Sequence, residues 1–236
     1  MSRLVLCGEG PSDFGLEGEY GPLALVVLKT LEYLATQEKV EYKIPETRRL
    51  YHRELAPARI KDGNSPIKKK MSYGRKGHLS LRDKAASFAK NHVDQGDIGV
   101  FHSDVDFTNH SDPDKCRTSV INDIRKGFSQ SDKSRYCCAI VTMPRTEAWL
   151  LYLATGKEFS PERIEKLPGN DKSPLAPKAI LHDMGYVTDN CHSRRKRNRP
   201  LGSIVEDFFN YDKMYRLPAY KQFFDAFASI DWKTLL

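Results

Sequence analysis

The stretch Asp97-Ile-Gly-Val-Phe-His-Ser-Asp-Val-Asp-Phe-Thr-Asn109 decides the fold. Its apolar part, residues 98–101, predicts a buried strand, and Asp104 and Asp106 follow it. In an open parallel α/β sheet, ligands bind beyond the carboxyl ends of the strands. Residues i and i+2 of an extended chain face the same side, so both carboxylates can reach one hard cation. Neither has an adjacent Lys or Arg, so two unpaired anions are expected to repel each other unless a cation intervenes. The alternative is an Asx-rich turn that caps the next helix.

Strands and helices are predicted to alternate on both sides of this stretch. Further strands are expected at residues 3–7, 40–44 and 136–141, and helices at residues 22–36, 80–93, 114–128 and from about 146. This alternation favours an α/β, Rossmann-like fold with a mostly parallel four-stranded sheet between helices. The strand at 136–141 is nearly all apolar, which favours a central position.

The remainder of the chain is predicted to be helical, with helices at residues 173–184, 201–209 and 217–227. We therefore expect a catalytic domain over residues 1–155 and a helical C-terminal extension over residues 156–236 that packs on it. Residues 45–78 show no sustained period and are rich in Pro, Gly, Lys and Arg, so they are read as a long connection.

Composition excludes several classes of protein. The 236 residues are 39% hydrophobic, and no stretch approaches 18 apolar residues, so we expect a globular protein without a membrane span. The beginning of the chain is too short for a secretory segment, which favours the cytoplasm. The five cysteines form no CxxC pair, so reduced and mostly buried thiols are expected in place of disulfides or a zinc site.

The net charge of +7 is unevenly distributed. Residues 1–42 hold seven acids and three bases, whereas residues 43–90 hold fourteen bases and four acids, and residues 193–199 hold five bases and no acid. Such segregation favours a polyanionic partner such as nucleic acid, and two solvated loops are the alternative. The candidate nucleic-acid contacts are Lys68, Lys69, Lys70, Arg75, Lys76, Arg194, Arg195, Lys196 and Arg197.

Two further acids are expected at the same edge of the sheet. Glu9 lies between two glycines directly after the first strand, where an open turn lets its carboxylate project into a cleft. Glu147 follows the fourth strand in the first turn of a helix, where it could also simply complement the helix dipole. Three of the strand-end loops therefore supply acids.

At this point the residues resemble a family. Gly8-Glu9-Gly10 after a first strand, followed by a strand and Asp104-Val105-Asp106, resembles the TOPRIM domain of topoisomerases, DnaG-type primases and the OLD-type and ribonuclease-M5-type nucleases. The stretch from Pro144 to Leu151 is similar to small stand-alone TOPRIM-like proteins of bacteria that are linked to phage defence. The resemblance covers about residues 1–155.

The resemblance implies roles for particular residues. Glu9 would be a metal ligand or general acid/base, and Asp104 and Asp106 would hold divalent metal, with Asp13 as a further metal candidate. The longer spacing from Glu9 to Asp104 implies a basic insertion at about residues 45–78. Arg145 and Lys178 are candidates for the basic residue that some family nucleases add near the site. A partner protein of the ATPase type, encoded nearby, is a further expectation.

The predicted chemistry is metal-dependent cleavage of nucleic acid. Hard carboxylate oxygens without Cys or clustered His favour Mg²⁺ or Mn²⁺. Two such ions about 4 Å apart could activate water and stabilise the attacking and leaving oxygens of a phosphodiester. The predicted catalytic set is Glu9, Asp104, Asp106 and Glu147. His102 and His110 flank the aspartate pair and are expected to be structural or exposed, with contact to a metal ligand or proton transfer as the alternatives.

Three other functions fit parts of the sequence. Asp104-Val105-Asp106-Phe107-Thr108 matches the DxDxT loop of haloacid-dehalogenase-type phosphatases, although that loop normally opens its domain. A DxD glycosyltransferase would leave the basic stretches and Glu9 without a role. A non-catalytic module that binds nucleic acid, or a toxin partner, would bind without cutting. These alternatives remain open at the level of sequence.

Overall fold

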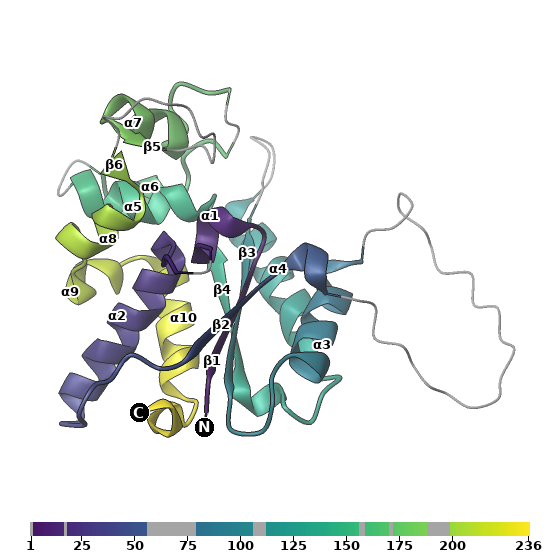
Figure 1. The fold of residues 1–236 in the computed structure, drawn as a ribbon. Coiled ribbons are helices and arrows are strands. Elements are labelled where there is room, and N and C mark those ends of the chain that lie inside the picture. Colours follow the sequence, from purple (N-terminus) through teal and green to yellow (C-terminus); the bar gives the residue numbers. More distant parts are fainter. Residues whose placement is uncertain are drawn as a thin grey trace, which may run out of the picture.

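The computed structural model describes residues 2–16, 18–55, 79–105, 112–155, 159–169, 172–187 and 199–236. Helices flank a four-stranded sheet, as Figure 1 shows. The strands of this sheet are β1 (Leu4–Gly8), β2 (Thr47–Tyr51), β3 (Ile98–Asp104) and β4 (Cys137–Thr142). They are all parallel and lie in the order β2-β1-β3-β4, which confirms the predicted α/β class and its parallel sheet.

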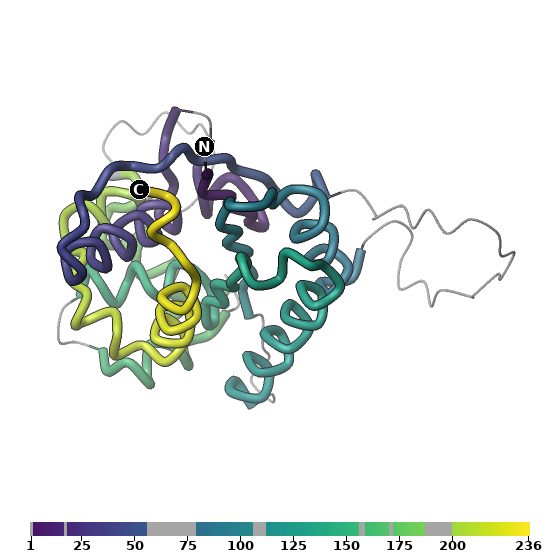
Figure 2. The backbone as a smooth tube through the Cα atoms, turned by 90° about the horizontal axis from the view of Figure 1, so that it is seen from below, coloured from purple at the N-terminus to yellow at the C-terminus, as the bar shows by residue number. Residues whose placement is uncertain are grey.

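Helices cover both faces of the sheet. The longer ones are α2 (Pro22–Gln37), α3 (Leu81–Asn91), α4 (Pro113–Phe128), α5 (Thr146–Thr155) and α10 (Pro218–Ala228). Alternate residues of a strand face opposite sides, so Val100 belongs to the apolar cluster of α2, α5 and α10, while Phe101 belongs to that of α3 and α4. Figure 2, seen from below, shows α2 and α10 on the side opposite α3 and α4. The central strands β1 and β3 are therefore buried on both faces.

Local sequence signals explain where the helices begin. Pro22 opens α2, where a missing backbone N–H costs nothing. Ser80 caps α3 by accepting a hydrogen bond from the backbone N of Asp83 at 3.1 Å. Asp112 caps α4 in the same way. The predicted helices at 22–36, 80–93 and 114–128 are confirmed to within two residues at each end.

The prediction of a strand at residues 40–44 was wrong. The second strand is β2, which pairs with β1 and lies inside the stretch that was expected to be a connection or insertion without regular structure. A 3-10 helix, η1 (His52–Glu54), follows it directly. As an edge strand, β2 keeps Arg48 exposed and Arg49 half-buried, so it lacks the apolar run that would have identified it. Residues 56–78 of the predicted insertion lie outside the described residues.

The predicted central position of the fourth strand was also wrong, because β4 is the edge strand beside β3. Cys138 and Ile140 face the cluster of α2, α5 and α10, whereas Val141 faces that of α3 and α4. Burial of both faces, without a second neighbouring strand, is enough to make a strand apolar. The apolar residues of β4 therefore reflect the helices that cover both of its faces, and they do not indicate a central position in the sheet.

The C-terminal part contributes short elements and α10. They are α6 (Pro161–Ile164), α7 (Pro177–Asp183), β5 (Tyr186–Val187), β6 (Arg199–Pro200), α8 (Gly202–Phe208), α9 (Tyr211–Met214) and η3 (Trp232–Leu235). The helix predicted at 173–184 is shorter than expected because Pro177 occupies its first turn. Tyr220 of α10 stands edge-on to Trp149 of α5 at 5.7 Å, so the two parts share one core. The division at residue 155 between a catalytic domain and a C-terminal extension remains a prediction.

Four of the five cysteines lie among the described residues. Within the described residues, Cys7, Cys116, Cys137 and Cys138 are free thiols, and Cys7 and Cys138 are buried. Cys191 lies outside the described residues. A search of the described helices finds none with the length and apolarity needed to cross a membrane.

Candidate functional site

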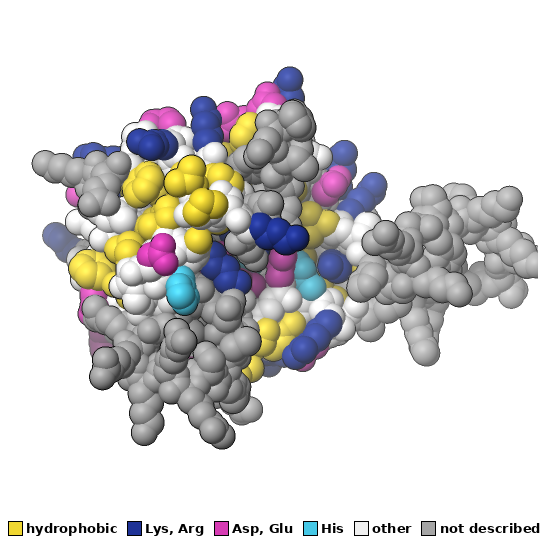
Figure 3. Space-filling model, turned by 90° about the horizontal axis from the view of Figure 1, so that it is seen from above, with side chains coloured by type: hydrophobic (Ala, Val, Ile, Leu, Met, Phe, Trp, Pro, Cys, Tyr) yellow, Lys and Arg dark blue, Asp and Glu magenta, His cyan; other side chains and the backbone are white. Residues whose placement is uncertain are grey.

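The carboxyl ends of three strands meet at the upper edge of the sheet in Figure 1. Glu9 directly follows β1, Asp104 is the last residue of β3, and Glu147 lies after β4 in the first turn of α5. Figure 3 looks down on this edge and shows acidic and histidine side chains near its middle, with Lys and Arg side chains around them. The fold therefore brings three of the predicted acids to one edge.

Glu9 is tied to β3. Its Oε1 atom accepts hydrogen bonds from Oγ of Ser103 at 3.0 Å and from the backbone N of Asp104 at 3.2 Å. The preceding Gly8 keeps the turn tight, because a Cβ atom there would lie 3.0 Å from Oδ2 of Asp13. Partial burial of the carboxylate, and then the negative charge of Asp104, raise the pKa of Glu9. A bound proton or cation would stabilise such a carboxylate.

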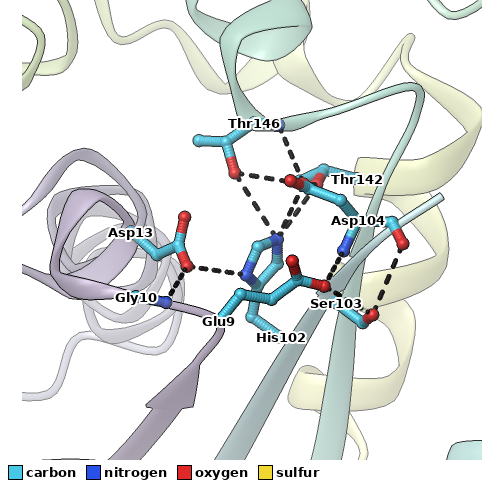
Figure 4. A network of polar contacts seen from close by, with 8 residues as sticks. All are labelled: Glu9, Gly10, Asp13, His102, Ser103, Asp104, Thr142 and Thr146. Carbon is cyan, nitrogen blue, oxygen red and sulfur yellow. Dashed lines mark hydrogen bonds and ion pairs between the residues drawn. The ribbon is translucent and has the colours of Figure 1, made fainter. Parts of the chain in front are cut away.

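Asp104 is held by β4 and by the start of α5. Its Oδ1 atom accepts hydrogen bonds from the backbone N of Thr146 at 3.1 Å and from Oγ1 of Thr142, and it lies 3.2 Å from Nε2 of His102 (Figure 4). The register of β3 and β4 places Thr142 directly beside Asp104. The side chain of Asp104 is 17% exposed, so part of the carboxylate still reaches solvent.

His102 lies between two carboxylates and is fully buried. Its Nδ1 atom is 3.4 Å from Oδ2 of Asp13, without the angle of a hydrogen bond, and its Nε2 atom faces Asp104. Burial alone would lower the pKa of His102, but Asp13 and Asp104 outweigh it and raise this pKa well above its usual value. Burial likewise opposes ionisation of Asp13, yet His102 lowers the pKa of that carboxyl below its usual value. Nδ1 of the ring therefore faces Asp13, while Nε2 faces Asp104 and also lies 3.0 Å from Oγ1 of Thr142.

Glu147 occupies a separate corner of the site. Burial, and then the charge of Asp104, raise the pKa of Glu147 to about 7, against the opposing effect of its own backbone N–H, Lys178 and Arg145. A small pocket beside it is lined by Arg145, Glu147, Pro168, Gly169, Ala176, Pro177 and Lys178. The two basic residues that the sequence singled out, Arg145 and Lys178, thus lie together with Glu147.

Several predicted site residues lie outside the described residues. Among the acids this concerns Asp106, and among the histidines His110. The basic candidates concerned are Lys68, Lys69, Lys70, Arg75, Lys76, Arg194, Arg195, Lys196 and Arg197. Their roles remain predictions from the sequence.

The acids of the site fit a hard divalent cation in part. Within the described ranges, no group of three or more His, Cys, Asp or Glu side chains is placed to hold a metal ion. Mg²⁺, however, commonly takes one or two carboxylates and fills its remaining positions with water and substrate phosphate. The carboxylates of Glu9 and Asp104 supply oxygen ligands, and the hydrogen bond from the backbone N of Asp104 to Glu9 keeps the two residues side by side, which suits that mode of binding.

Sequence reasoning missed how much of the site is made by neutral and imidazole side chains. Ser103, Thr142 and Thr146 hold the acids, and Asp13, which was predicted to bind metal, contacts His102. One signal was present, since His102 interrupts an apolar strand two residues before Asp104 and so shares its face. The threonines carry no comparable signal, because Thr142 meets Asp104 through strand pairing and Thr146 meets it through the position of the first turn of α5.

Comparison with models of protein families, with curated proteins and with solved structures found no match for this chain.

Proposed function

We propose that this protein is a metal-dependent nuclease that hydrolyses phosphodiester bonds of DNA or RNA in the cytoplasm. One observation carries the proposal: acids from three strand ends gather at one edge of the sheet, where burial, and then the charge of Asp104, raise the pKa of both Glu9 and Glu147. Carboxylates whose ionisation is opposed by burial and by a neighbouring negative charge are typical of sites that bind a cation or exchange a proton.

Mg²⁺ or Mn²⁺ would be held by Glu9 and Asp104, with Asp106 and Glu147 as further predicted ligands. When bound, the ion would supply positive charge to a phosphodiester and a more acidic water molecule. Glu9, whose pKa is raised, suits the transfer of a proton at the same place. Ser103 keeps this carboxylate on β3, and Thr142 and Thr146 keep Asp104 at the edge.

Positive charge around this edge supports a nucleic-acid substrate. The chain leaves the sheet after Leu55, which follows β2, and returns at Leu79 before α3, and seven of the fourteen bases of residues 43–90 lie between these points. Because α3 must run back to the start of β3, both points lie at the carboxyl edge. Arg145 and Lys178 lie beside Glu147 at the same edge. Contacts of bases with phosphates provide affinity without sequence preference.

The proposal extends to the family that the sequence resembles. A parallel four-stranded sheet, with Glu9 after the first strand and Asp104 at the end of the third, supports a TOPRIM-like arrangement. From that resemblance follow two more proposals, which are a role in phage defence and control by a partner protein of the ATPase type.

Cleavage assays with the full chain test the proposed activity. Labelled single-stranded and double-stranded DNA and RNA are incubated with Mg²⁺, Mn²⁺ or a chelator. We expect cleavage that requires the metal and that falls by a factor on the order of 10² or more in Glu9→Gln and in Asp104→Asn. Glu147→Gln is expected to lose activity less severely, with partial rescue by raised Mn²⁺.

The matched control is Glu206→Gln, the same chemical change at an exposed residue of α8, which should cleave as wild type does. Full activity in Glu9→Gln would refute the assignment of this site. Hydrolysis of p-nitrophenyl phosphate together with inert diesters would favour the phosphatase alternative. Binding of nucleic acid without cleavage under all metal conditions would favour a non-catalytic module.

A further inference from the structure

The buried contact between Asp13 and His102 has no place in the proposed chemistry, although it lies directly behind Asp104. We infer that His102, held by Asp13, is a positioning residue that fixes the carboxylate of Asp104 with Oδ1 turned inward, so that Oδ2 alone serves a metal ion. The inference rests on the proposed function only in taking that ligand to be a divalent cation.

The hydrogen bonds of Asp104 are divided unequally between its two oxygens. Thr142 and Thr146 donate to Oδ1, and Nε2 of His102 lies 3.2 Å from the same atom. A carboxylate oxygen has two lone pairs, so the donors from Thr142 and Thr146 already fill those of Oδ1. Among the described residues, none donates a hydrogen bond to Oδ2. One oxygen of Asp104 is thus committed to the protein, and the other remains for a ligand.

Asp13 is withdrawn from the cleft. The residue is 6% exposed, and its Oδ2 atom accepts a hydrogen bond from the backbone N of Gly10 at 3.1 Å while facing Nδ1 of His102 at 3.4 Å. Figure 4 shows the order Asp13, His102, Asp104 across the end of the sheet. Asp13 therefore acts on Asp104 through His102, and it is not assigned to the metal as a direct ligand.

The shape of the imidazole ring suits this task. The ring is rigid, it is flanked edge-on by Phe14 at 6.1 Å, and its two nitrogens point toward different carboxylates. Removing partners that orient a metal ligand typically lowers metal affinity by about 10- to 100-fold. A merely structural histidine would leave the affinity of the folded protein for the metal unchanged.

Two amide substitutions separate the two sides of the ring. In His102→Gln the terminal amide can take the place of Nε2 and still donate to Asp104, but it loses the contact with Asp13. In His102→Asn the shorter amide can take the place of Nδ1 and keep Asp13, but it cannot reach Asp104. The full chain of each variant is titrated with Mn²⁺ alone, with free Mn²⁺ followed by electron paramagnetic resonance, and its melting curve is recorded beside it.

We expect His102→Gln to bind Mn²⁺ within about threefold of wild type and His102→Asn to bind about 10- to 100-fold more weakly. A folded His102→Asn that binds Mn²⁺ as wild type does would overturn the inference, and so would equal loss in both variants. If His102→Asn does not fold, Thr142→Val replaces it, since it removes another donor to Oδ1 with little change of shape. Thr142→Ser keeps that donor and should bind normally; equal affinity in both threonine variants would again overturn the inference.

The outcome is distinguishable from failure of the proposed nuclease. If wild type cleaves nucleic acid and His102→Asn binds Mn²⁺ with unchanged affinity, the proposed nuclease activity is supported and the inference about His102 is refuted. If His102→Asn binds Mn²⁺ more weakly but wild type cleaves no nucleic acid, the inference is supported and the proposed nuclease activity is refuted. If wild type binds no Mn²⁺ at millimolar concentration, both the inference about His102 and the proposed metal-dependent nuclease are refuted.

Discussion

Nε2 of His102 lies 3.2 Å from Oδ1 of Asp104, two residues further along the same strand. Because alternate residues of a strand share a face, this contact is built into β3 itself. Asp104 therefore has a histidine as a neighbour on its own strand, whereas the sequence had shown only that no Lys or Arg adjoins it. The expected repulsion between Asp104 and Asp106 stays a prediction, because Asp106 lies outside the described residues.

The first prediction concerns the stability of Asp104 variants without metal. Sequence reasoning alone would have Asp104→Ala melt no earlier than wild type, but this change leaves His102 with a single carboxylate and Thr142 and Thr146 without their acceptor. We expect Asp104→Ala to lower the free energy of unfolding by about 2–4 kcal/mol and Asp104→Asn, which keeps an acceptor, to lower it less. Urea denaturation in the presence of a chelator measures both.

Glu206→Ala serves as the control for this comparison, because substitution of an exposed helical residue usually changes stability by less than about 0.5 kcal/mol. Wild-type stability in Asp104→Ala would contradict the pairing and restore the picture of repelling carboxylates.

The sequence predicted the fold class and the acids of the site, for reasons that can be named. Strands such as β1 and β3 are apolar because helices cover both faces. Ser80 marks a helix start through its capping hydrogen bond, and Pro22 marks another because it lacks the backbone N–H that would have no partner there. The edge strand β2 was missed because Arg48 and Arg49 interrupt its pattern. Apolar runs and helix-start residues thus predicted the strands and helices whose positions depend on burial and on interactions between residues close in sequence.

Contacts between distant strands could not be predicted in the same way. Thr142 meets Asp104 because β4 pairs with β3 in one register, and Ser103 meets Glu9 because β1 lies beside β3. A single sequence contains no signal for register when both faces of a strand are buried, since alternation of polar and apolar residues is then lost. The partners of the acids therefore required the structure.

The second prediction concerns Glu165, a buried acid that joins two helices. Its Oε1 atom accepts a hydrogen bond from the backbone N of Ala219 at 3.0 Å in α10, and its Oε2 atom accepts one from Arg117 of α4 at 3.3 Å. The residue is 2% exposed, so Glu165→Ala should lower the free energy of unfolding by about 2–3 kcal/mol. Urea denaturation of Glu165→Ala, Arg117→Ala and the double variant isolates the coupling, and strictly additive losses would contradict it.

The third prediction concerns the basic stretches outside the described residues. Changing Lys68, Lys69 and Lys70 to Gln, or Arg194, Arg195 and Lys196 to Gln, should weaken binding to all nucleic acids. The slope of log affinity against log salt should fall by up to about 0.9 for each phosphate of duplex DNA that is no longer neutralised. The control with equal loss of charge is Lys39, Lys43 and Lys233 to Gln, at the opposite end of the sheet, which should leave the slope unchanged. Equal slopes in all three triple variants would mean that the basic stretches are solvated loops.

The last prediction uses the proton that Glu147 binds in the folded state. Its pKa is about 7 there and near the usual 4.5 in the unfolded chain, so between these values the folded state holds a proton that the unfolded state lacks. Stability due to this group therefore falls as the pH rises from about 4.5 to about 7, and stays low above that range. Glu147→Gln removes the ionisation, so we expect it to be more stable than wild type by up to about 3 kcal/mol above neutral pH and equal to wild type below the window. Urea denaturation of both proteins with a chelator at several pH values gives this difference, in which the titration of Glu165 cancels because both proteins contain it. A difference that does not change with pH would mean that Glu147 only complements the dipole of α5, and would remove it from the proposed site.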